Sequence, residues 1–236
     1  MLSETYRPET FNDIIGHTEA KKVLSSYLRA NTPGKCVLIC GSPGIGKTTL
    51  ALTAARTTEH EPLEINASRS LRSHDDVTNL RDSCMAPVSF TSFVKYGDKP
   101  RKTCVILDEI DGSDPHAQRK VLEWIRDPKR VVPIVCTSNE IPVIFKRATE
   151  SVIIHRCMPL NTRDLYENLQ KYTPTPYAEF QMIVKECQHD VRRLMNRFQY
   201  GQSDILKQVP VTGDVIADLF KHQETFYGVQ PTYWDL

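Results

Sequence analysis

The sequence lacks the features that would place the chain in a membrane or outside the cell. No apolar run approaches the roughly 20 residues that a bilayer-spanning helix requires. The opening residues, Met1 to Glu4, contain no basic stretch that leads into an apolar one, so we expect no secretory signal. These absences predict an intracellular protein without a membrane partner.

The chain also lacks a CxxC pair, although it has seven cysteines. This spacing is poor for a zinc site, and an odd count fits a reducing compartment better than a disulfide framework. Cys36, Cys40, Cys104 and Cys136 lie in or beside apolar runs, so we interpret them as small core residues. The formal net charge is only +1. A nucleic-acid surface would therefore have to be a local patch, or be shared with partner subunits.

Short apolar runs rich in β-branched residues recur through the first two thirds of the chain. They cover residues 36–40, 63–65, 104–107, 134–136 and 152–154. Because these runs show no polar alternation, we expect strands that are buried on both faces of a parallel sheet. Helical patterns lie between the strands, and one of them opens at Asp114-Pro115 with an N-cap acid and a first-turn proline. The alternation predicts an α/β fold with a five-stranded parallel sheet flanked by helices.

After about residue 160 the strand signal ends, and three helical patterns follow at 164–171, 177–187 and 190–200. We therefore predict an α/β domain over 1–160, a small all-helical domain over 161–202 and a partly helical tail over 203–236. The tail contains one further helical pattern at 215–221 and ends in aromatic residues, which either pack on their own domain or dock on a partner.

The segment Gly41–Thr48 fits the pattern G-x-x-x-x-G-K-[ST] between a predicted strand and a predicted helix. In such a loop the backbone N–H groups and the helix N-terminus face the phosphates of a nucleotide. Lys47 would reach the β- and γ-phosphates, and the Thr48 hydroxyl would bind Mg²⁺. The predicted phosphate-binding residues are Gly41, Ser42, Pro43, Gly44, Ile45, Gly46, Lys47, Thr48 and Thr49.

Two acids follow the apolar strand that ends at Leu107. At a strand's carboxyl end, Asp108 would hold Mg²⁺ directly or through water, and Glu109 would orient and deprotonate the attacking water. A later strand ends in Ser138-Asn139, and Asn139 would help to hold this water or contact the γ-phosphate. The chemistry predicted is hydrolysis of ATP to ADP and phosphate, with ATP and Mg²⁺ as the cofactors.

These motifs, and their order along the chain, resemble those of the clamp-loader branch of the AAA+ ATPases. The subunits of replication factor C are the most similar members of that branch. The opening segment from Tyr6 to His17 is similar to the family's "YRPxxFxDIxGxx". The resemblance implies an AAA+ core followed by a helical lid domain. It also implies that the adenine pocket is formed by Tyr6, Arg7, Pro8, Ile14 and Ile15.

Further motifs extend the resemblance to about residue 200. Asn66-Ala-Ser68 is similar to "NASD", with Arg69 in place of the acid. The DEIDG sequence that begins at Asp108 and the SNE sequence around Asn139 resemble the large subunit more than the small ones. The segment 189–199 is similar to "GDxRxxLNxLQ", which implies that Arg192 reaches the γ-phosphate from the lid.

The resemblance implies an ATP-hydrolysing subunit of a sliding-clamp loader in DNA replication, whose ATPase activity is weak without partners. Those partners would be the other subunits of a hetero-oligomeric ring, the sliding clamp, and primer–template DNA held through its backbone. The location would be the nucleus or another site of DNA replication, in a eukaryotic or viral setting. Candidate DNA contacts are Arg69 and Arg72, and a basic loop that contains Lys95, Lys99, Arg101 and Lys102.

The chain departs from the family in two places. The Ser-Arg-Cys arginine finger is absent: its position reads Phe145-Lys-Arg147, and His155-Arg156-Cys157 comes later. Only residues 203–236 follow the predicted lid, where the family has a longer helical collar. The chain is therefore either a minimal, divergent relative (a viral one, for example) or one that assembles by other contacts. Two alternatives stay open: an ATP-binding scaffold subunit that does not hydrolyse, and another AAA+ protein of recombination or helicase loading.

Overall fold

The computed structural model describes residues 7–30, 32–84, 86–170 and 175–200. Its centre is a five-stranded sheet with the strand order β2-β3-β4-β1-β5, in which every pairing is parallel. The strands are β1 (Cys36–Cys40), β2 (His60–Asn66), β3 (Lys102–Asp108), β4 (Ile134–Ser138) and β5 (Val152–Arg156). The predicted α/β class and the five-stranded parallel sheet are therefore confirmed.

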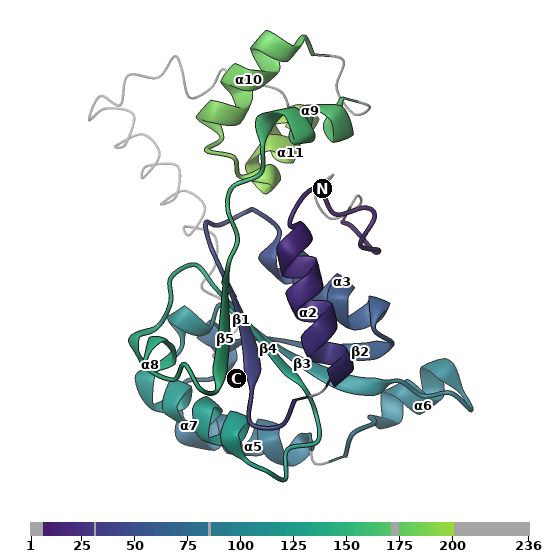
Figure 1. Ribbon diagram of the computed structural model, residues 1–236, viewed down its shortest axis with the longest axis vertical. Helices are drawn as coiled ribbons and strands as arrows, with labels where there is room; N and C mark the ends of the chain where they lie inside the picture. The colour runs from purple at the N-terminus through teal and green to yellow at the C-terminus, as the bar shows by residue number, and fades with distance from the viewer. Residues whose placement is uncertain (1–6, 31, 85, 171–174, 201–236) are drawn as a thin grey trace, which may run out of the picture. The chain divides into compact units, whose positions relative to one another are not determined.

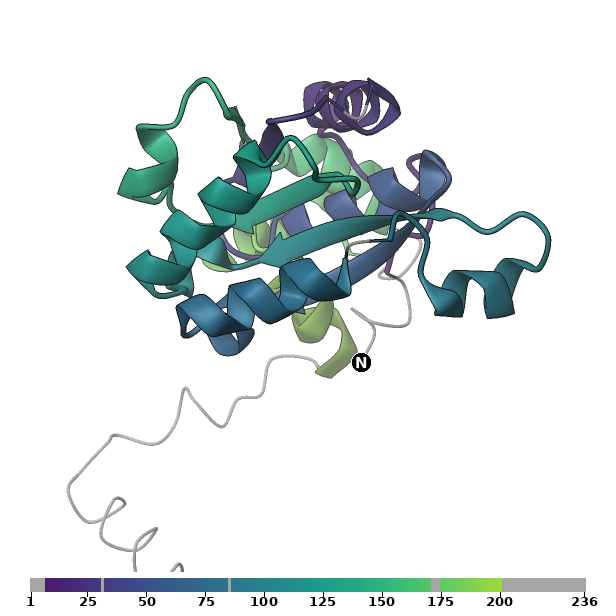
Figure 2. The ribbon, with the colours of Figure 1, turned by 90° about the horizontal axis from the view of Figure 1, so that it is seen from below.

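Helices cover both faces of this sheet (Figures 1 and 2). On one face, α2 (Thr18–Ala30) and α3 (Lys47–Thr57) pack through Leu24 and Leu50 onto strand residues such as Ile106. On the other face lie α5 (His74–Ser83), α7 (Pro115–Arg126) and α8 (Val143–Lys146). Each face has its own apolar cluster, as expected when side chains alternate across a strand that is covered on both sides.

The burial of the strands follows their place in the sheet. Every residue of β1 and β4 is buried, whereas β2 and β5 are partly exposed. The expectation that all five strands are buried on both faces is wrong for β2 and β5, because these two form the edges of the sheet. Cys36, Cys104 and Cys136 lie inside the apolar clusters, and Cys40 is also buried, so their interpretation as core residues is confirmed.

The last described part of the chain is helical, with α9 (Thr162–Leu169), α10 (Tyr177–Glu186) and α11 (Val191–Tyr200). These helices share an apolar cluster that includes Leu165 and Phe180, and Phe180 stacks on Phe198 with ring centroids 5.8 Å apart. The described residues before Tyr200 fall in one compact unit. The predicted helix at 215–221 and the aromatic tail lie outside the described residues.

Short helices complete the described fold: α4 (Ala67–Ser70), α6 (Phe90–Tyr96) and the 3₁₀ turn η1 (Ile110–Gly112). The basic segment predicted as a loop is in part helical, since Lys95 lies on α6. The periodicity of α6 is too short to recognise, but Ser89 caps it and Gly97, with φ 58°, ends it. In the ranges that the structure describes, no helix is both long and apolar enough to cross a membrane.

Candidate active site

The carboxyl ends of three neighbouring strands, β3, β4 and β1, lie side by side. The predicted catalytic segments meet there. Gly41 follows β1, Asp108 ends β3, and Asn139 follows β4. The parallel register places Cys40 beside Ser138 and Asn66 beside Asp108. Ligand sites in such sheets lie at the carboxyl ends of the strands, so the topology brings residues that are far apart in sequence into one site.

The loop before α3 has the backbone that a phosphate-binding loop requires. Gly44 and Gly46 have φ values of 72° and 95°, in the left-handed region that favours glycine, and α3 begins at Lys47. Lys47 Nζ donates to the carbonyl oxygens of Gly41 and Ser42, each at 2.8 Å, and to Asn139 Oδ1 at 2.9 Å. Burial lowers the pKa of Lys47, and the nearby Asp108 partly opposes this. The ammonium group is thus surrounded by oxygens.

Asp108 has hydroxyl neighbours from two elements. Thr48 Oγ1, in the first turn of α3, donates to Asp108 Oδ1 at 2.6 Å, and the Thr137 hydroxyl of β4 donates to the same oxygen. A carboxylate and a hydroxyl side by side supply the oxygen ligands that Mg²⁺ prefers. The donor set of Thr48 and Asp108 therefore fits Mg²⁺, which typically completes its coordination with phosphate and water.

Glu109 is held in a left-handed conformation with φ 55°, which is uncommon outside glycine. Its Oε2 accepts hydrogen bonds from Asn66 Nδ2 at 3.0 Å and from Ser68 Oγ at 3.1 Å. Asn66 ends β2 and Ser68 follows it, both in the segment that resembles "NASD". The motif was recognisable in the sequence, but its contact with Glu109 was not, since the two lie on different strands.

A second carboxylate, that of Asp111, fixes the loop after β4. Its Oδ2 accepts the backbone N–H groups of Asn139 at 3.0 Å and Glu140 at 3.1 Å. Asp111 was quoted in the sequence as part of the DEIDG motif without a role. In the structure it positions the Asn139 side chain, which in turn bonds Lys47.

One cavity of about 790 Å³ opens above these strand ends. Many of the residues predicted for ATP and Mg²⁺ line it: Arg7, Pro8, Ile14, Ile15, Pro43, Gly44, Ile45, Gly46, Lys47, Thr48, Thr49, Asp108, Glu109, Asn139 and Arg192. Gly41 and Ser42 are not among the lining residues, although their carbonyl oxygens bond Lys47. Tyr6 lies outside the described residues.

The segment predicted to contact adenine is held by hydrogen bonds from residues that the sequence analysis did not single out. Lys21 Nζ donates to the carbonyl oxygens of Phe11 at 2.8 Å and Ile14 at 2.7 Å. His17 Nε2 lies 2.9 Å from the carbonyl oxygen of Ile45 in the phosphate-binding loop, and burial lowers the pKa of His17. These contacts connect the opening segment to the loop at one end of the cavity.

The helices at the end of the described chain also reach the cavity. The N–H of Val191 donates to the carbonyl oxygen of Gly44 at 3.0 Å. A Cβ placed on Gly44 would meet Asp190 Oδ1 at 1.9 Å, so this approach requires glycine. Arg192 is exposed and lines the cavity, together with the apolar Leu169 and Met195. The sequence predicted Arg192 but not these two apolar neighbours.

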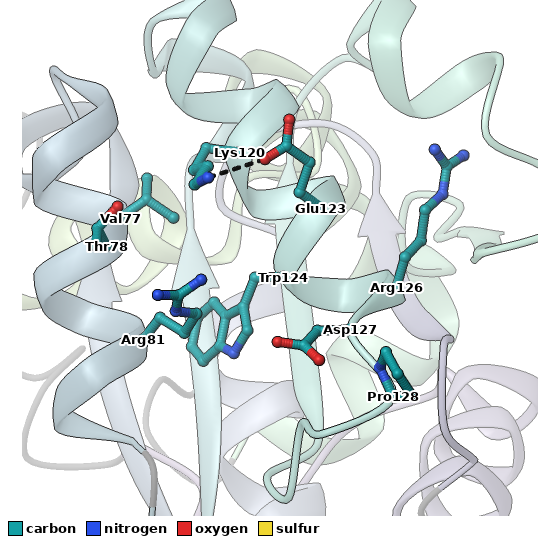
Figure 3. Close-up of a pocket in the computed structure, with 9 residues that line it drawn as sticks. All are labelled: Val77, Thr78, Arg81, Lys120, Glu123, Trp124, Arg126, Asp127 and Pro128. Atoms are coloured by element: carbon teal, nitrogen blue, oxygen red, sulfur yellow. Dashed lines mark hydrogen bonds and ion pairs between the residues drawn. The ribbon is translucent and has the colours of Figure 1, made fainter.

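A second cavity, of about 410 Å³, lies between α5 and α7 (Figure 3). Val77 and Trp124 line it, as do several charged residues, of which Lys120 and Glu123 form an ion pair at 2.9 Å. None of the residues predicted for ATP or Mg²⁺ lines this cavity. Trp124 is 4% exposed and belongs to the apolar cluster of that face, so it is a packing residue.

Comparison with known proteins agrees with this geometry. Residues 37–157 match the family described as "ATPase family associated with various cellular activities (AAA)". A replication factor C small subunit of Methanococcus maripaludis is 32% identical over 212 residues, which are 83% of this chain and 62% of the relative. A replication factor C large subunit of the same species is also 32% identical, over 143 residues, or 58% of this chain and 28% of the relative. The chain thus spans less than two thirds of these relatives.

Among solved structures, the RuvB Holliday junction branch migration motor of Thermotoga maritima superposes with a TM-score of 0.63. The match covers 92% of this chain and 72% of RuvB at 18% identity, so it concerns the fold alone. The resemblance to replication factor C subunits, drawn from the motifs, is confirmed by the relatives, and both kinds of subunit are similar. The chain belongs to the AAA family of ATPases.

Proposed function

We propose that the chain binds ATP with Mg²⁺ in the large cavity and hydrolyses it, as a subunit of a replication factor C-like clamp loader in DNA replication. The observation that carries this proposal is the gathering of chemically distinct groups around one cavity. The phosphate-binding loop, the Asp108-Glu109 pair, Asn139 and Arg192 all line it. Each group comes from a different element, and each matches one requirement of phosphoryl transfer to water.

The phosphates are bound by the backbone N–H groups of the loop and by Lys47. The oxygens that now surround Lys47 Nζ keep the ammonium at the loop, so it is already positioned for the β- and γ-phosphates. Thr48 and Asp108 hold Mg²⁺, which neutralises phosphate charge when bound. The adenine ring packs against Pro8, Ile14 and Ile15, on the segment that Lys21 ties down.

Hydrolysis follows from the positions of three further side chains. Glu109 orients a water molecule and accepts its proton as the oxygen attacks the γ-phosphorus, and the bond to the β-phosphate oxygen breaks. Asn139, fixed by Asp111 and bonded to Lys47, contacts the γ-phosphate or the water. Arg192 adds positive charge from α11 as charge on the γ-phosphate is redistributed.

The proposed partners come from the relatives, whose names describe them as subunits of replication factor C. We propose a hetero-oligomeric ring with other such subunits, which holds a sliding clamp and primer–template DNA through backbone contacts. In that setting ATPase activity is weak for the isolated chain and rises with partners. The site of action is the place of DNA replication.

The test is steady-state ATP hydrolysis by the purified chain and by the complex that a tagged copy retrieves, each with and without primed DNA and clamp. Lys47→Ala is the blank, and Glu109→Gln should bind ATP but hydrolyse it at least about a hundredfold more slowly. Stimulation by DNA and clamp that disappears in Lys47→Ala supports the clamp-loader function. ATP hydrolysis that is unchanged by primed DNA and clamp would indicate an ATPase that acts with another partner.

A scaffold that binds ATP without hydrolysing it is the second candidate, and one observation favours it. Oε2 of the Glu109 carboxylate already accepts hydrogen bonds from Asn66 and Ser68, which compete with a water molecule for this oxygen. If this arrangement persists with ATP bound, Glu109→Gln would behave like the unaltered protein in every assay. A slower Glu109→Gln variant excludes the scaffold.

A further inference from the structure

Two consecutive peptide groups of the phosphate-binding loop have their carbonyl oxygens bound from outside the loop. His17 Nε2 lies 2.9 Å from the carbonyl oxygen of Ile45, and the N–H of Val191 donates to the carbonyl oxygen of Gly44 at 3.0 Å. A carbonyl that is hydrogen-bonded in this way fixes the orientation of its peptide group. The opening segment and α11 therefore each hold one peptide group of the loop.

The direction of the Ile45 carbonyl also sets the direction of the next N–H group. The peptide bond between Ile45 and Gly46 is trans and planar, so its C=O and its N–H point to opposite sides. Because the carbonyl is directed to His17, the N–H of Gly46 points away from His17. Gly46 lines the large cavity and His17 does not. The bond to His17 thus orients a loop N–H without any contact between His17 and the cavity.

The imidazole of His17 is suited to donate this hydrogen bond. Burial lowers the pKa of His17, and the hydrogen bond to Ile45 opposes this only in part. The ring is therefore neutral at pH 7 and carries one N–H. A carbonyl oxygen can only accept, so the proton of the neutral ring must lie on Nε2.

The backbone around His17 is shaped to bring the ring to the loop. His17 and Gly16 have φ values of 54° and 65°, a left-handed conformation that is uncommon for a residue other than glycine. A Cβ on Gly16 would meet Leu160 Cδ2 at 2.9 Å, and the N–H of Lys21 donates to the His17 carbonyl oxygen at 3.0 Å. Helix α2, which follows His17, packs beside α3, which follows the loop (Figure 1). Such unfavourable conformations persist where neighbouring contacts hold them, and they cluster at functional sites.

We propose that His17 is a positioning residue for phosphate binding, which holds the Ile45 peptide group so that the N–H of Gly46 donates to a bound phosphate. The inference rests on the proposed function, since it concerns the same cavity. It adds a residue that touches neither the nucleotide nor the metal and acts only through Ile45. The affinity of the cavity for a phosphate chain should therefore depend on His17 whether or not an adenosine group is attached to that chain.

The test is calorimetric titration of the full chain, in the presence of Mg²⁺, with ADP and with inorganic tripolyphosphate. His17→Leu keeps an apolar side chain but cannot donate, and it should bind both ligands about tenfold more weakly, since a hydrogen bond to a charged group is weakened. His17→Gln can donate from its amide nitrogen in place of Nε2, and it should bind both within about twofold of the unaltered chain.

His60→Leu is the matched control. His60 is also buried, has a lowered pKa and bonds one side chain, that of Thr58, but it lies at the start of β2 and does not line the cavity. It should lower the thermal stability and leave both affinities unchanged. In steady-state hydrolysis, His17→Leu should raise KM for ATP about tenfold and change kcat less than about twofold, because the phosphate contact is made in the ground state as well as in the transition state.

A second measurement needs no altered residue to remain folded. Nitrogen-15 NMR of histidine-labelled chain shows which ring nitrogen carries the proton, and His17→Gln identifies the His17 signals by their loss. We expect the proton on Nε2, both in the free chain and with Mg²⁺ and ADP bound.

Three results would overturn the inference and leave the proposed function intact. A proton on Nδ1 would leave Nε2 with no hydrogen to donate to Ile45. Unchanged affinity for ADP and tripolyphosphate in His17→Leu would mean that the loop needs no support from His17. Weaker binding of ADP alone would place the effect of His17 at the adenine end of the cavity. If the unaltered chain binds neither ligand, the proposed function fails and this inference fails with it.

Discussion

At the scale of single residues, the site is a set of contacts that pass from one strand end to the next. Asp111 bonds the backbone of Asn139, Asn139 bonds Lys47, and the hydroxyl of Thr48 bonds Asp108. Each side chain is thus held by a neighbour from another element. Catalysis of phosphoryl transfer depends mainly on positioning, so loss of one contact should affect the groups next to it.

Asp108→Asn tests the proposed role of Asp108 as a metal ligand. The substitution keeps an oxygen that can accept from Thr48 but removes the negative charge that attracts Mg²⁺. We expect the Mg²⁺ concentration for half-maximal ATP hydrolysis to rise at least about tenfold, or about 1.4 kcal/mol of binding free energy. The measurement is ATPase rate against Mg²⁺ at fixed ATP, with the exposed Asp75→Asn as control. Identical Mg²⁺ curves for both variants would remove Asp108 from the metal site.

The lowered pKa of His17 predicts how the free energy of unfolding changes with pH. Burial lowers its pKa, and it does so for His60 as well, so the folded protein binds protons less readily than the unfolded chain, in which histidine titrates near about 6.5. As the pH falls through that value, the unfolded state takes up protons first and the free energy of unfolding decreases. Urea unfolding between pH 7.5 and 5.5 should show this decrease.

The His17→Gln variant should show a smaller decrease over the same pH range, since one of the two groups no longer titrates. His116→Gln, at an exposed position, is the matched control and should keep the full decrease. Equal pH dependence in His17→Gln and the unaltered chain would mean that His17 is protonated equally in the folded and unfolded states.

At the scale of elements, α7 offers a test of how the sequence sets a helix start. Asp114 Oδ1 accepts the N–H of His116 at 2.7 Å, and Pro115 occupies the first helical position. Asp114→Ala should lower the free energy of unfolding by about 1 kcal/mol, because a first-turn N–H loses its partner. Asp114→Ser keeps a capping oxygen and should remain within about 0.5 kcal/mol of the unaltered chain. Urea unfolding at pH 7 measures both, and equal losses would argue against capping.

The elements that the sequence predicted well are those with a strong local signal. The strand Cys36–Cys40 has the predicted bounds, since an unbroken apolar run precedes a glycine-rich loop. The start of α7 was marked by Asp114-Pro115. By contrast, β2 is seven residues long where only 63–65 stood out, because an edge strand keeps polar residues such as His60 and Glu61. Helix α6 was missed because its seven residues are too few to show a helical period.

The candidate site was predictable to the extent that its residues lie in ordered motifs. The phosphate-binding loop, Asp108-Glu109 and Asn139 each follow a strand, so their meeting at one edge follows from a parallel sheet. The contact of Asn66 and Ser68 with Glu109 depends on β2 and β3 being neighbours, which no local pattern reveals. The same holds for His17, whose partner Ile45 lies 28 positions away.

At the scale of the whole molecule, the cavity is lined both by residues at the ends of the strands and by residues of the helices after residue 160. Leu169, Arg192 and Met195 line it from the helical side, and Val191 bonds the phosphate-binding loop at Gly44. A nucleotide in the cavity would therefore contact both parts of the compact unit. Binding to the folded state alone stabilises it, by about 2.7 kcal/mol when the ligand is at 100 times its dissociation constant.

Arg192 should make this stabilisation specific for the triphosphate. Because we propose that it contacts the γ-phosphate, Arg192→Ala should weaken ATP binding about tenfold, or about 1.4 kcal/mol, and leave ADP binding nearly unchanged. Thermal unfolding in a Glu109→Gln background, where ATP persists, would then show a larger excess of the ATP shift over the ADP shift when Arg192 is present than in Arg192→Ala. Arg193→Ala is the matched control, since Arg193 neighbours Arg192 and pairs with Asp190 at 3.8 Å but does not line the cavity. The same excess of the ATP shift over the ADP shift with and without Arg192 would show that the γ-phosphate is contacted from the sheet side alone, by Lys47 and Asn139.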